Sequence, residues 1–277
     1  MKVVIVGLGV IGGSFAMALK DAGYKNVYGI DNNEETLLKA EKLNLIRRGY
    51  TDGNEILKDA DLLIISIYPK LVKDFIKNNI DNFKDGAVIT DATGIKKLFI
   101  NDIVNILPSN IDFVFGHPMA GREKKGIDFA SSDVFKGANY ILTPTSKNKE
   151  DNLKLVENLA YEIGFKRVKR ISPEFHDEMI GFTSQLPHSL AVALVNSDLE
   201  GRDTGSFIGD SYRDLTRIAN INEDLWSELF LGNKENLLKS IESFECELDK
   251  IKDAIKDDDK ESLKELFIKS TKRREKL

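Results

Sequence analysis

The sequence predicts an α/β protein in two parts: a doubly wound parallel sheet over residues 1–171 and an all-helical region over residues 172–277. Three observations lead to this fold class. Short apolar runs rich in β-branched residues alternate with helical segments as far as Arg170, as in sheets covered by helices on both faces. From Ser172 onward no convincing strand follows, and 277 residues are long for a single core. The third observation is a glycine-rich turn directly after the first strand.

That turn lies in the segment KVVIVGLGVIGGSF at residues 2–15. Val3–Val6 have the composition of a strand buried on both faces, and a helix-compatible segment runs from Ser14 to Ala22. The spacing Gly-x-Gly-x-x-Gly suits a dinucleotide: the first glycine permits a tight turn, the second admits a pyrophosphate, and the third lets the helix pack closely. The anion would rest on N–H groups at the helix N-terminus. A turn that binds nothing is the alternative. The candidate cofactor-binding residues are Gly7, Leu8, Gly9, Val10, Ile11 and Gly12.

A second strand, Asn26–Ile30, ends in Asp31. An acidic residue about 20 positions past the glycines binds the adenosine ribose hydroxyls in Rossmann-type domains. Asn32 and Asn33 follow, and no arginine is near to accept a 2′-phosphate. The pattern therefore predicts a Rossmann-type N-terminal domain that prefers NAD over NADP.

The remaining elements of this domain follow in alternation. Pro69 suits the first turn of a helix, and Thr93-Gly94 separates a strand from the next helix. Loops that follow strands lie at the carboxyl edge of such a sheet, so Ser66 and Tyr68 are cofactor-contact candidates, although a plain strand-to-helix turn is the alternative. The expected strands are Leu62–Ile67, Gly86–Asp91, Ile111–Phe115, Asn139–Leu142 and Phe165–Arg170, and the expected helices are Glu34–Leu43, Lys70–Asn78, Ile95–Ile106 and Glu150–Ile163.

The second part begins with Ser172 as a helix N-cap and Pro173 at the first helical position. The long helix expected from there to about Leu199 is apolar on more than one face, which is typical of a helix buried between subunits or at the centre of a bundle. Further helices are expected at Asp210–Ala219, Glu223–Phe230, Lys234–Ile255 and Lys260–Lys272.

Composition excludes several classes of function. The net charge of −5 disfavours a nucleic-acid partner, and no apolar run approaches the length of a membrane span. Met1-Lys2 leads directly into a strand, so we expect a cytoplasmic protein without a signal peptide. Cys246 is the only cysteine, which excludes an internal disulfide; we expect it to be packed on a helix. No metal site is expected, because the three histidines lack ligand spacing and 257–259, a run of three aspartates, suits a helix N-terminus.

Four residues could carry chemistry. His117, in GHPMAG, follows a strand at the carboxyl edge of the sheet, where a histidine can accept a hydroxyl proton as hydride leaves the same carbon. Taken singly, each has an ordinary interpretation: His117 as a structural loop residue, His188 as a core histidine, Arg217 as the partner of Asp214 in a surface ion pair, and Trp226 as core.

Together these segments resemble a known family. The segments GLGVIGGS, DATGIK, GHPMAGRE, HDEMIGFTSQLPHSLA and YRDLTRIANINEDLW have the order and spacing of prephenate dehydrogenases, over nearly the whole chain. The resemblance implies NAD-dependent oxidation of prephenate on the route to tyrosine, in a homodimer joined through the helical domain. It implies that His117 polarises the C4 hydroxyl, Arg217 holds the ring carboxylate and His188 lies at the pyruvyl side chain. Glu123 and Asp214 would form an ionic network around the arginine, with Trp226 near the site.

The sequence departs from the family at Gly94, where a serine is common. Whether the neighbouring hydroxyl of Thr93 replaces that serine beside the nicotinamide stays open. Arogenate, which carries an amine where prephenate has a ketone, is the alternative substrate. A β-hydroxyacid dehydrogenase or a nonenzymatic NAD-sensing protein are the other classes considered.

Overall fold

A computed structural model describes residues 1–122 and 124–276. Six parallel strands form the central sheet in the order β3-β2-β1-β4-β5-β6. Their bounds are β1 Val3–Val6, β2 Val27–Ile30, β3 Gly49–Tyr50, β4 Leu62–Ile65, β5 Val88–Asp91 and β6 Asp112–Val114. The doubly wound order confirms the predicted fold class.

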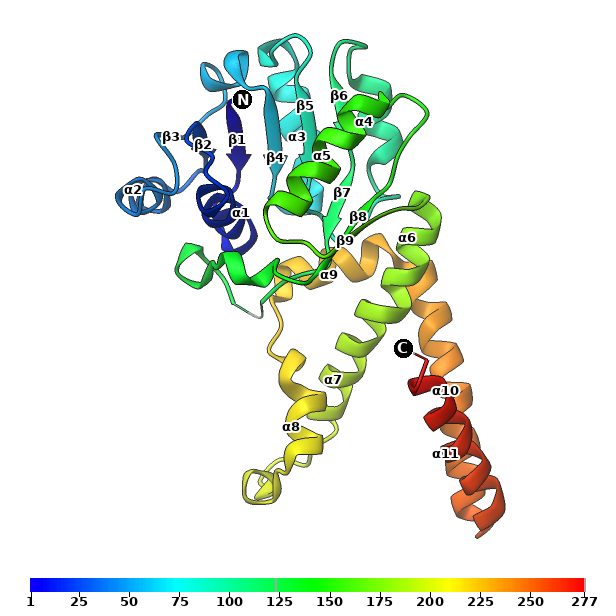
Figure 1. Cartoon of the computed structure of the whole chain (residues 1–277). Coiled ribbons are helices and arrows are strands. Elements are labelled where there is room, and N and C mark those ends of the chain that lie inside the picture. The colour runs from blue at the N-terminus through cyan, green and yellow to red at the C-terminus, as the bar shows by residue number, and fades with distance from the viewer. Residues whose placement is uncertain (123, 277) are drawn as a thin grey trace.

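Alternation along β1 explains why this sheet is buried on both faces. Val3 and Ile5 point into one apolar core with α1 (Val10–Asp21), α2 (Glu34–Lys42) and α5 (Glu150–Glu162). Val4 and Val6 point into the other, against α3 (Pro69–Asn79) and α4 (Ile100–Ile106). Successive side chains of a strand face opposite sides, so a run of apolar residues supplies both cores at once. Figure 1 shows the helices on the two faces.

Two of the expected strands belong to a second sheet. β7 (Gly116–Pro118) pairs antiparallel with β8 (Asn139–Leu142), and β8 pairs parallel with β9 (Arg167–Arg170). The expectation that residues 139–142 and 165–170 extend the central sheet is therefore wrong. The physical reason is visible in β9, whose RVKR side chains are exposed or half-buried and suit an edge strand rather than a strand covered on both faces.

Two helices start well away from the expected residue. α1 starts at Val10 rather than Ser14, so Gly12 and Gly13 are helical. α4 starts at Ile100 rather than Ile95. Residues 95–99 form a turn because the Lys96 and Lys97 N–H groups donate to a side chain of the second part of the chain, not to helical carbonyls.

The regular elements of the second part, within its described residues, are all helices. Ser172 caps α6 (Pro173–Ile180) and Pro173 is its first residue, as predicted. A π-helical segment, Gly181–Gln185, joins α6 to α7 (Leu186–Asn196), so the expected long helix is not uniform. The chain continues through α8 (Asp210–Thr216), the short turn Arg217–Ala219, α9 (Glu223–Gly232), α10 (Lys234–Lys256) and α11 (Lys260–Arg274).

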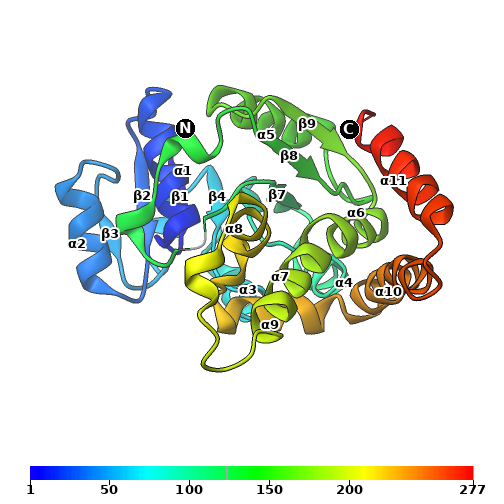
Figure 2. The same ribbon diagram turned by 90° about the horizontal axis from the view of Figure 1, so that it is seen from below.

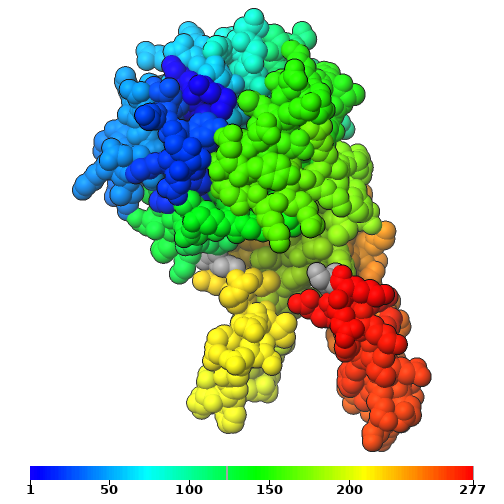
Figure 3. Space-filling view, viewed as in Figure 1, coloured from blue at the N-terminus to red at the C-terminus, as the bar shows by residue number. Residues whose placement is uncertain are grey.

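These helices form two arms that diverge from the sheet domain. One arm contains α7 and α8, and the other contains α10 and α11; open space separates them in Figures 1 and 3. Both arms extend from the same side of the sheet domain in Figure 1, and the view from below in Figure 2 shows α7 and α8 over the middle of the molecule and α10 and α11 to one side. Cys246 lies on α10 as expected, but it is exposed, so the expectation that it is packed is wrong for the protomer. Within the described part of the chain, none of the helices has the length and apolar character that crossing a membrane requires.

Candidate active site

The glycine-rich turn has the shape of a phosphate cradle. Gly7 has a φ of +84°, and a Cβ on it would lie 2.6 Å from Ser66 O. A Cβ on Gly12 would lie 1.8 Å from Gly7 O, so only glycine fits there. A Cβ on Gly9 would meet nothing within 4 Å, and Gly9 is the N-cap residue of α1, where no side chain accepts from the helix N–H groups. The turn is therefore tight at both ends and open in the middle, where an anion can reach those N–H groups.

Two polar side chains border this cradle. Asp31 follows β2 and accepts hydrogen bonds from Leu8 N–H (2.7 Å) and Asn33 N–H (2.9 Å), which ties the turn to the next strand. Ser66 follows β4, and its buried hydroxyl has no hydrogen-bond partner among the described residues. A buried hydroxyl without a partner costs free energy unless a ligand satisfies it. The open turn and the unpaired hydroxyl together fit a bound dinucleotide.

A buried ion pair lies at the end of β5. Lys96 is fully buried, and its Nζ donates to Asp91 Oδ2 (2.5 Å) and Gly116 O (2.5 Å). Asp91 also accepts from Gly116 N–H at 3.0 Å. Thr93 belongs to the same cluster: its hydroxyl donates to Asp91 and accepts from Lys96. These contacts commit Thr93 to the ion pair and fix the start of β7 against β5.

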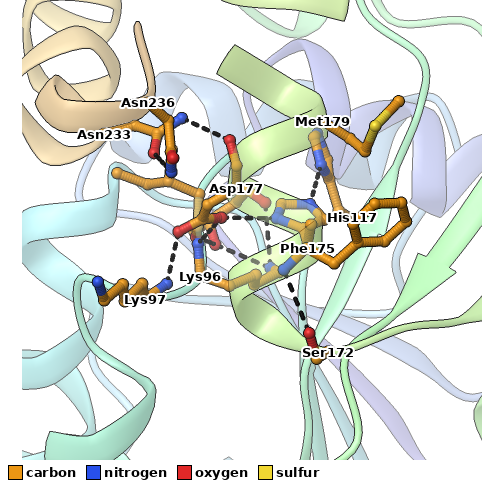
Figure 4. A network of polar contacts seen from close by, with 12 residues as sticks. Lys96, Lys97, His117, Ser172, Phe175, Asp177, Met179, Asn233 and Asn236 are labelled. Carbon is orange, nitrogen blue, oxygen red and sulfur yellow. Dashed lines mark hydrogen bonds and ion pairs between the residues drawn. The ribbon is translucent and has the colours of Figure 1, made fainter. Parts of the chain in front are cut away.

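His117 lies on β7, a strand rather than the loop expected from the sequence. Its Nδ1 is 2.9 Å from His176 Nε2, and His176 Nδ1 is 2.6 Å from Asp177 Oδ1. Asp177 in turn accepts from the Lys96 N–H (2.9 Å) and the Lys97 N–H (2.8 Å). Figure 4 shows this chain of contacts, which links β7, α6 and the turn after β5.

The other nitrogen of His117 lies opposite Gly94. A Cβ on Gly94 would be 3.8 Å from His117 Nε2 and 3.2 Å from Leu229 Cδ2 on α9. Gly94 itself places no side chain beside Nε2, and Leu229 of the second part of the chain lies next to this glycine.

Burial and charge keep both imidazoles neutral. The pKa of His117 lies well below the ordinary histidine value of 6.5, first because of burial and then because of His176 and Lys96. Burial also lowers the pKa of His176, and the hydrogen bond to Asp177 only partly offsets this effect. A neutral imidazole can accept a proton, so His117 is suited to act as a base.

A second cluster gathers residues of the helical part. The ring of His188 stacks on Trp226 with centroids 3.7 Å apart, and its Nδ1 is 2.8 Å from Ser184 O. Arg217 begins the turn Arg217–Ala219, which packs against α7, the helix that carries His188. Asp214 lies on α8, directly before this turn.

The two clusters meet at α9. Trp226 belongs to the second cluster, and Leu229 on the same helix borders Gly94 and His117. Gln185 of the π-helical segment donates to Leu229 O at 2.8 Å, which ties α9 to the residues preceding α7. Glu123 lies outside the described residues.

His176 and Asp177 are the site residues that sequence reasoning missed. Both belong to the segment HDEMIGF that carries the family resemblance, but nothing local singled them out. The available signal was a His-Asp pair one turn after the predicted N-cap Ser172. In residues 1–122 and 124–276, no three His, Cys, Asp or Glu side chains are placed to hold a metal ion.

Comparison with known proteins gives the family. The model "Prephenate dehydrogenase, nucleotide-binding domain" matches residues 15–169, and "Prephenate dehydrogenase, dimerization domain" matches residues 172–269. A prephenate dehydrogenase of Bacillus subtilis is 31% identical over 274 residues, covering 96% of this chain and 73% of the relative.

Two solved structures have the same fold along the whole chain. The prephenate dehydrogenase of Aquifex aeolicus, in complex with hydroxyphenyl propionate and NAD+, has a TM-score of 0.90 and 35% identity, covering 99% of this chain and 98% of the other. An arogenate dehydrogenase of Synechocystis has a TM-score of 0.83 and 26% identity, covering 100% and 99%. The resemblance seen in the sequence is thereby confirmed, and the chain belongs to the prephenate dehydrogenase family of NAD-dependent oxidoreductases.

Proposed function

We propose that this protein catalyses the NAD-dependent oxidative decarboxylation of prephenate to 4-hydroxyphenylpyruvate. Residues 1–171 would form the cofactor domain, and residues 172–277 would hold the substrate and a second subunit. The observation that carries the proposal is His117, a buried imidazole of lowered pKa whose Nε2 lies beside Gly94, at the junction of the two parts. The cytoplasm is the expected location for a biosynthetic reaction of this kind.

The chain's residues have separate roles in this reaction. The glycine turn holds the pyrophosphate, Asp31 the adenosine ribose, and Ser66 lies beside the cofactor. NAD supplies the acceptor for the hydride that leaves C4 of the substrate. His117 Nε2 accepts the proton of the C4 hydroxyl as the carbon–oxygen double bond forms. Loss of CO2 from the ring carbon opposite then sends its electron pair through the ring, and the oxygen recovers the proton as a phenol.

Substrate recognition requires cations, because prephenate carries two carboxylates. We assign the ring carboxylate to Arg217 and the pyruvyl side chain to His188, which Trp226 holds by stacking. Glu123 and Asp214 would form the ionic network around the arginine. Thr93 is not a replacement for the family serine in this proposal, since its hydroxyl is committed to Asp91.

The direct test is NADH absorbance with prephenate and with arogenate, each combined with NAD and with NADP. We expect turnover with prephenate and NAD. Turnover on arogenate alone would replace the prephenate assignment by arogenate oxidation, and absence of turnover with both substrates would contradict the enzymatic proposal.

Two substitutions test the assigned roles. His117→Ala should lower kcat by about 10²–10⁴-fold, the usual contribution of acid–base help. Arg217→Ala should mainly raise KM for prephenate, because it removes a carboxylate contact. Arg167→Ala on the exposed edge strand β9 is the matched control and should leave both constants unchanged. An Arg217 variant with wild-type kinetics would remove this residue from the pocket.

We also propose a homodimer formed by the two arms. Large apolar side chains are exposed on both arms of the protomer, which is unusual for a surface in contact with water. They are Leu194, Val195, Leu199, Phe207 and Leu215 on the first arm, and Leu248, Ile255, Phe267 and Ile268 on the second. The match of residues 172–269 to a dimerisation domain supports the second copy as the occupant of this surface.

A further inference from the structure

The contacts around His117 determine which of its nitrogens carries the proton. Asp177 Oδ1 lies 2.6 Å from His176 Nδ1, and both oxygens of this side chain already act as acceptors for the N–H groups of Lys96 and Lys97. His176 must therefore carry a proton on Nδ1, since two lone pairs at this distance would repel. His176 is 1% exposed and neutral, so its Nε2 is unprotonated and accepts.

The same reasoning extends one residue further. His117 Nδ1 lies 2.9 Å from His176 Nε2, and a bare Nε2 requires a donor opposite. The proton of neutral His117 is therefore on Nδ1, and its Nε2 lone pair is left free beside Gly94. We propose that His176 and Asp177 are positioning residues that hold His117 in the tautomer able to accept the substrate's hydroxyl proton. The tautomer follows from the contacts together with the neutral state that burial favours for both rings, whereas its use in catalysis rests on the proposed function.

The contacts of Asp177 fix the direction in which these hydrogen bonds are donated. Its two oxygens accept from the backbone N–H groups of Lys96 and Lys97 as well as from His176, and its own carbonyl accepts from Asn233 Nδ2 at 2.8 Å. The carboxylate therefore has fixed donors on both oxygens and is 1% exposed. Because both oxygens are held by these donors, the carboxyl group cannot rotate without losing backbone hydrogen bonds.

The contacts also make the tautomer depend on how the two parts of the chain are docked. His117 belongs to β7, whereas His176 and Asp177 belong to the first turns of α6. The N–H donors to Asp177 come back from the turn after β5. His117 therefore has the tautomer that accepts a proton only when α6 packs against the turn after β5.

Nuclear magnetic resonance of the full chain labelled with ¹⁵N-histidine tests the tautomer without any substrate. The chain has only three histidines, so the imidazole spectrum contains three pairs of nitrogens. We expect a protonated Nδ1 and a bare Nε2 for both His117 and His176. His188 is the internal reference, because its Nδ1 faces Ser184 O and must also carry a proton. A proton on Nε2 of His117 in the wild-type protein would overturn the proposal even if the enzyme is active.

Asp177→Asn reverses the polarity. When the amide nitrogen takes the place of Oδ1, it loses the hydrogen bond from the Lys96 N–H and donates to His176 Nδ1 instead. The proton of His176 then moves to Nε2, and that of His117 moves to Nε2 as well. We expect the ¹⁵N signals of His117 and His176 to change in this way, while those of His188 stay the same. We also expect kcat to fall by up to about 10⁴-fold, as when a carboxylate that fixes a histidine tautomer is replaced by its amide, with little change in KM.

A second pair of variants tests the positioning role even if the Asp177→Asn variant does not fold. His176→Gln retains a carbonyl that can accept from His117 Nδ1, whereas His176→Leu retains no acceptor. We expect the Gln variant to recover most of the activity that the Leu variant loses, with a Tm close to that of the Leu variant. Equal activity of the two variants would contradict the positioning role.

Asp112→Asn is the matched control for loss of a buried carboxylate. Asp112 accepts from the Lys149 N–H at 2.9 Å and from the Asn152 side chain, at the amino end of β6, whereas His117 follows the carboxyl end of that strand. This variant should lower stability but leave kcat and the histidine spectra unchanged. A comparable loss of kcat in Asp112→Asn would show that the effect at Asp177 is general destabilisation, which would refute the positioning role.

Discussion

Groups on three elements surround His117, whose pKa lies below the ordinary value first because of burial. His176 comes from α6, Lys96 comes from the turn after β5, and Asp91 at the end of β5 neutralises that lysine. Asp177 acts on His117 only through His176. Burial is the largest contribution that lowers the pKa of His117, followed by His176 and then by Lys96.

This environment predicts the pH dependence of the reaction. His117 works as a base only when it is neutral, and its pKa is lowered, so the neutral form persists as the pH falls through the ordinary value of 6.5. We therefore expect kcat to stay constant through that value and to fall only at more acidic pH. The measurement is kcat against pH at saturating prephenate and NAD. A decline of kcat centred at or above 6.5 would show that burial does not lower this pKa.

Asp31 is the residue that should set cofactor preference. Its carboxylate is held by the Leu8 N–H and would repel a 2′-phosphate while accepting from a ribose hydroxyl. We expect Asp31→Ala to lower kcat/KM for NAD by about 10–100-fold, as for loss of a hydrogen bond to a charged group, and to lower it less for NADP. Steady-state kinetics with both cofactors measure the ratio, and an unchanged ratio would exclude the ribose contact.

The sequence could identify His117 but not the residues that orient it. His117 belongs to a specific motif, GHPMAGRE, so the resemblance locates it directly. Its partner His176 is 59 residues away in the chain, and only the packing of α6 against β7 brings the two rings together. The role of Thr93 could not be inferred for the same reason, because its hydroxyl is taken by Asp91 and by Lys96, which folds inward instead of continuing a helix.

At the scale of elements, the glycine turn was the most predictable feature. Each glycine has the geometry that its function requires, because spacing within a strand–turn–helix unit is local information. The small sheet was not predictable to the same degree. Whether β8 and β9 join the central sheet depends on partners distant in sequence, and only the polar side chains of β9 hinted at an edge.

Two alanine substitutions in the glycine-rich turn should distinguish an effect on folding from an effect on cofactor binding. Gly12→Ala places a Cβ 1.8 Å from Gly7 O, so we expect it to lower the free energy of unfolding by about 1–3 kcal/mol, the usual cost of overpacking, or more. Gly9→Ala meets no atom within 4 Å, so its Tm without cofactor should match the wild type while KM for NAD rises. Thermal unfolding and initial rates distinguish the two. A Gly9→Ala enzyme with wild-type KM would show that no pyrophosphate approaches there.

At the scale of the whole molecule, the two arms indicate how copies associate. Phe207 on the first arm is 85% exposed in the protomer, whereas Leu38 on α2 is 66% exposed but far from the arms. We expect Phe207→Glu to weaken the dimer, since burying such a side chain contributes about 1.5–3 kcal/mol. Leu38→Glu is the control and should not affect association. Sedimentation equilibrium gives the dimer dissociation constant, and equal constants for the two variants would remove Phe207 from the interface.

The two-part architecture could be predicted because the pattern of apolar residues changes period near Ile171. The angle between the arms could not, because it depends on contacts between helices that each have polar and apolar faces. Gly181 is an example: a Cβ there would lie 3.1 Å from the Cβ of Asn236, so the absence of a side chain sets how closely α10 approaches.

The π-helical segment Gly181–Gln185 fixes the rotational phase between the two halves of the rod that α6 and α7 form. Each residue added to or removed from an α-helix turns everything beyond it by about 100°. Shortening this segment by one residue would leave His176 in place against β7 while swinging His188 away from the ring of Trp226. The π-helical segment thus allows the continuous helix of α6 and α7 to direct His176 toward β7 and His188 toward Trp226.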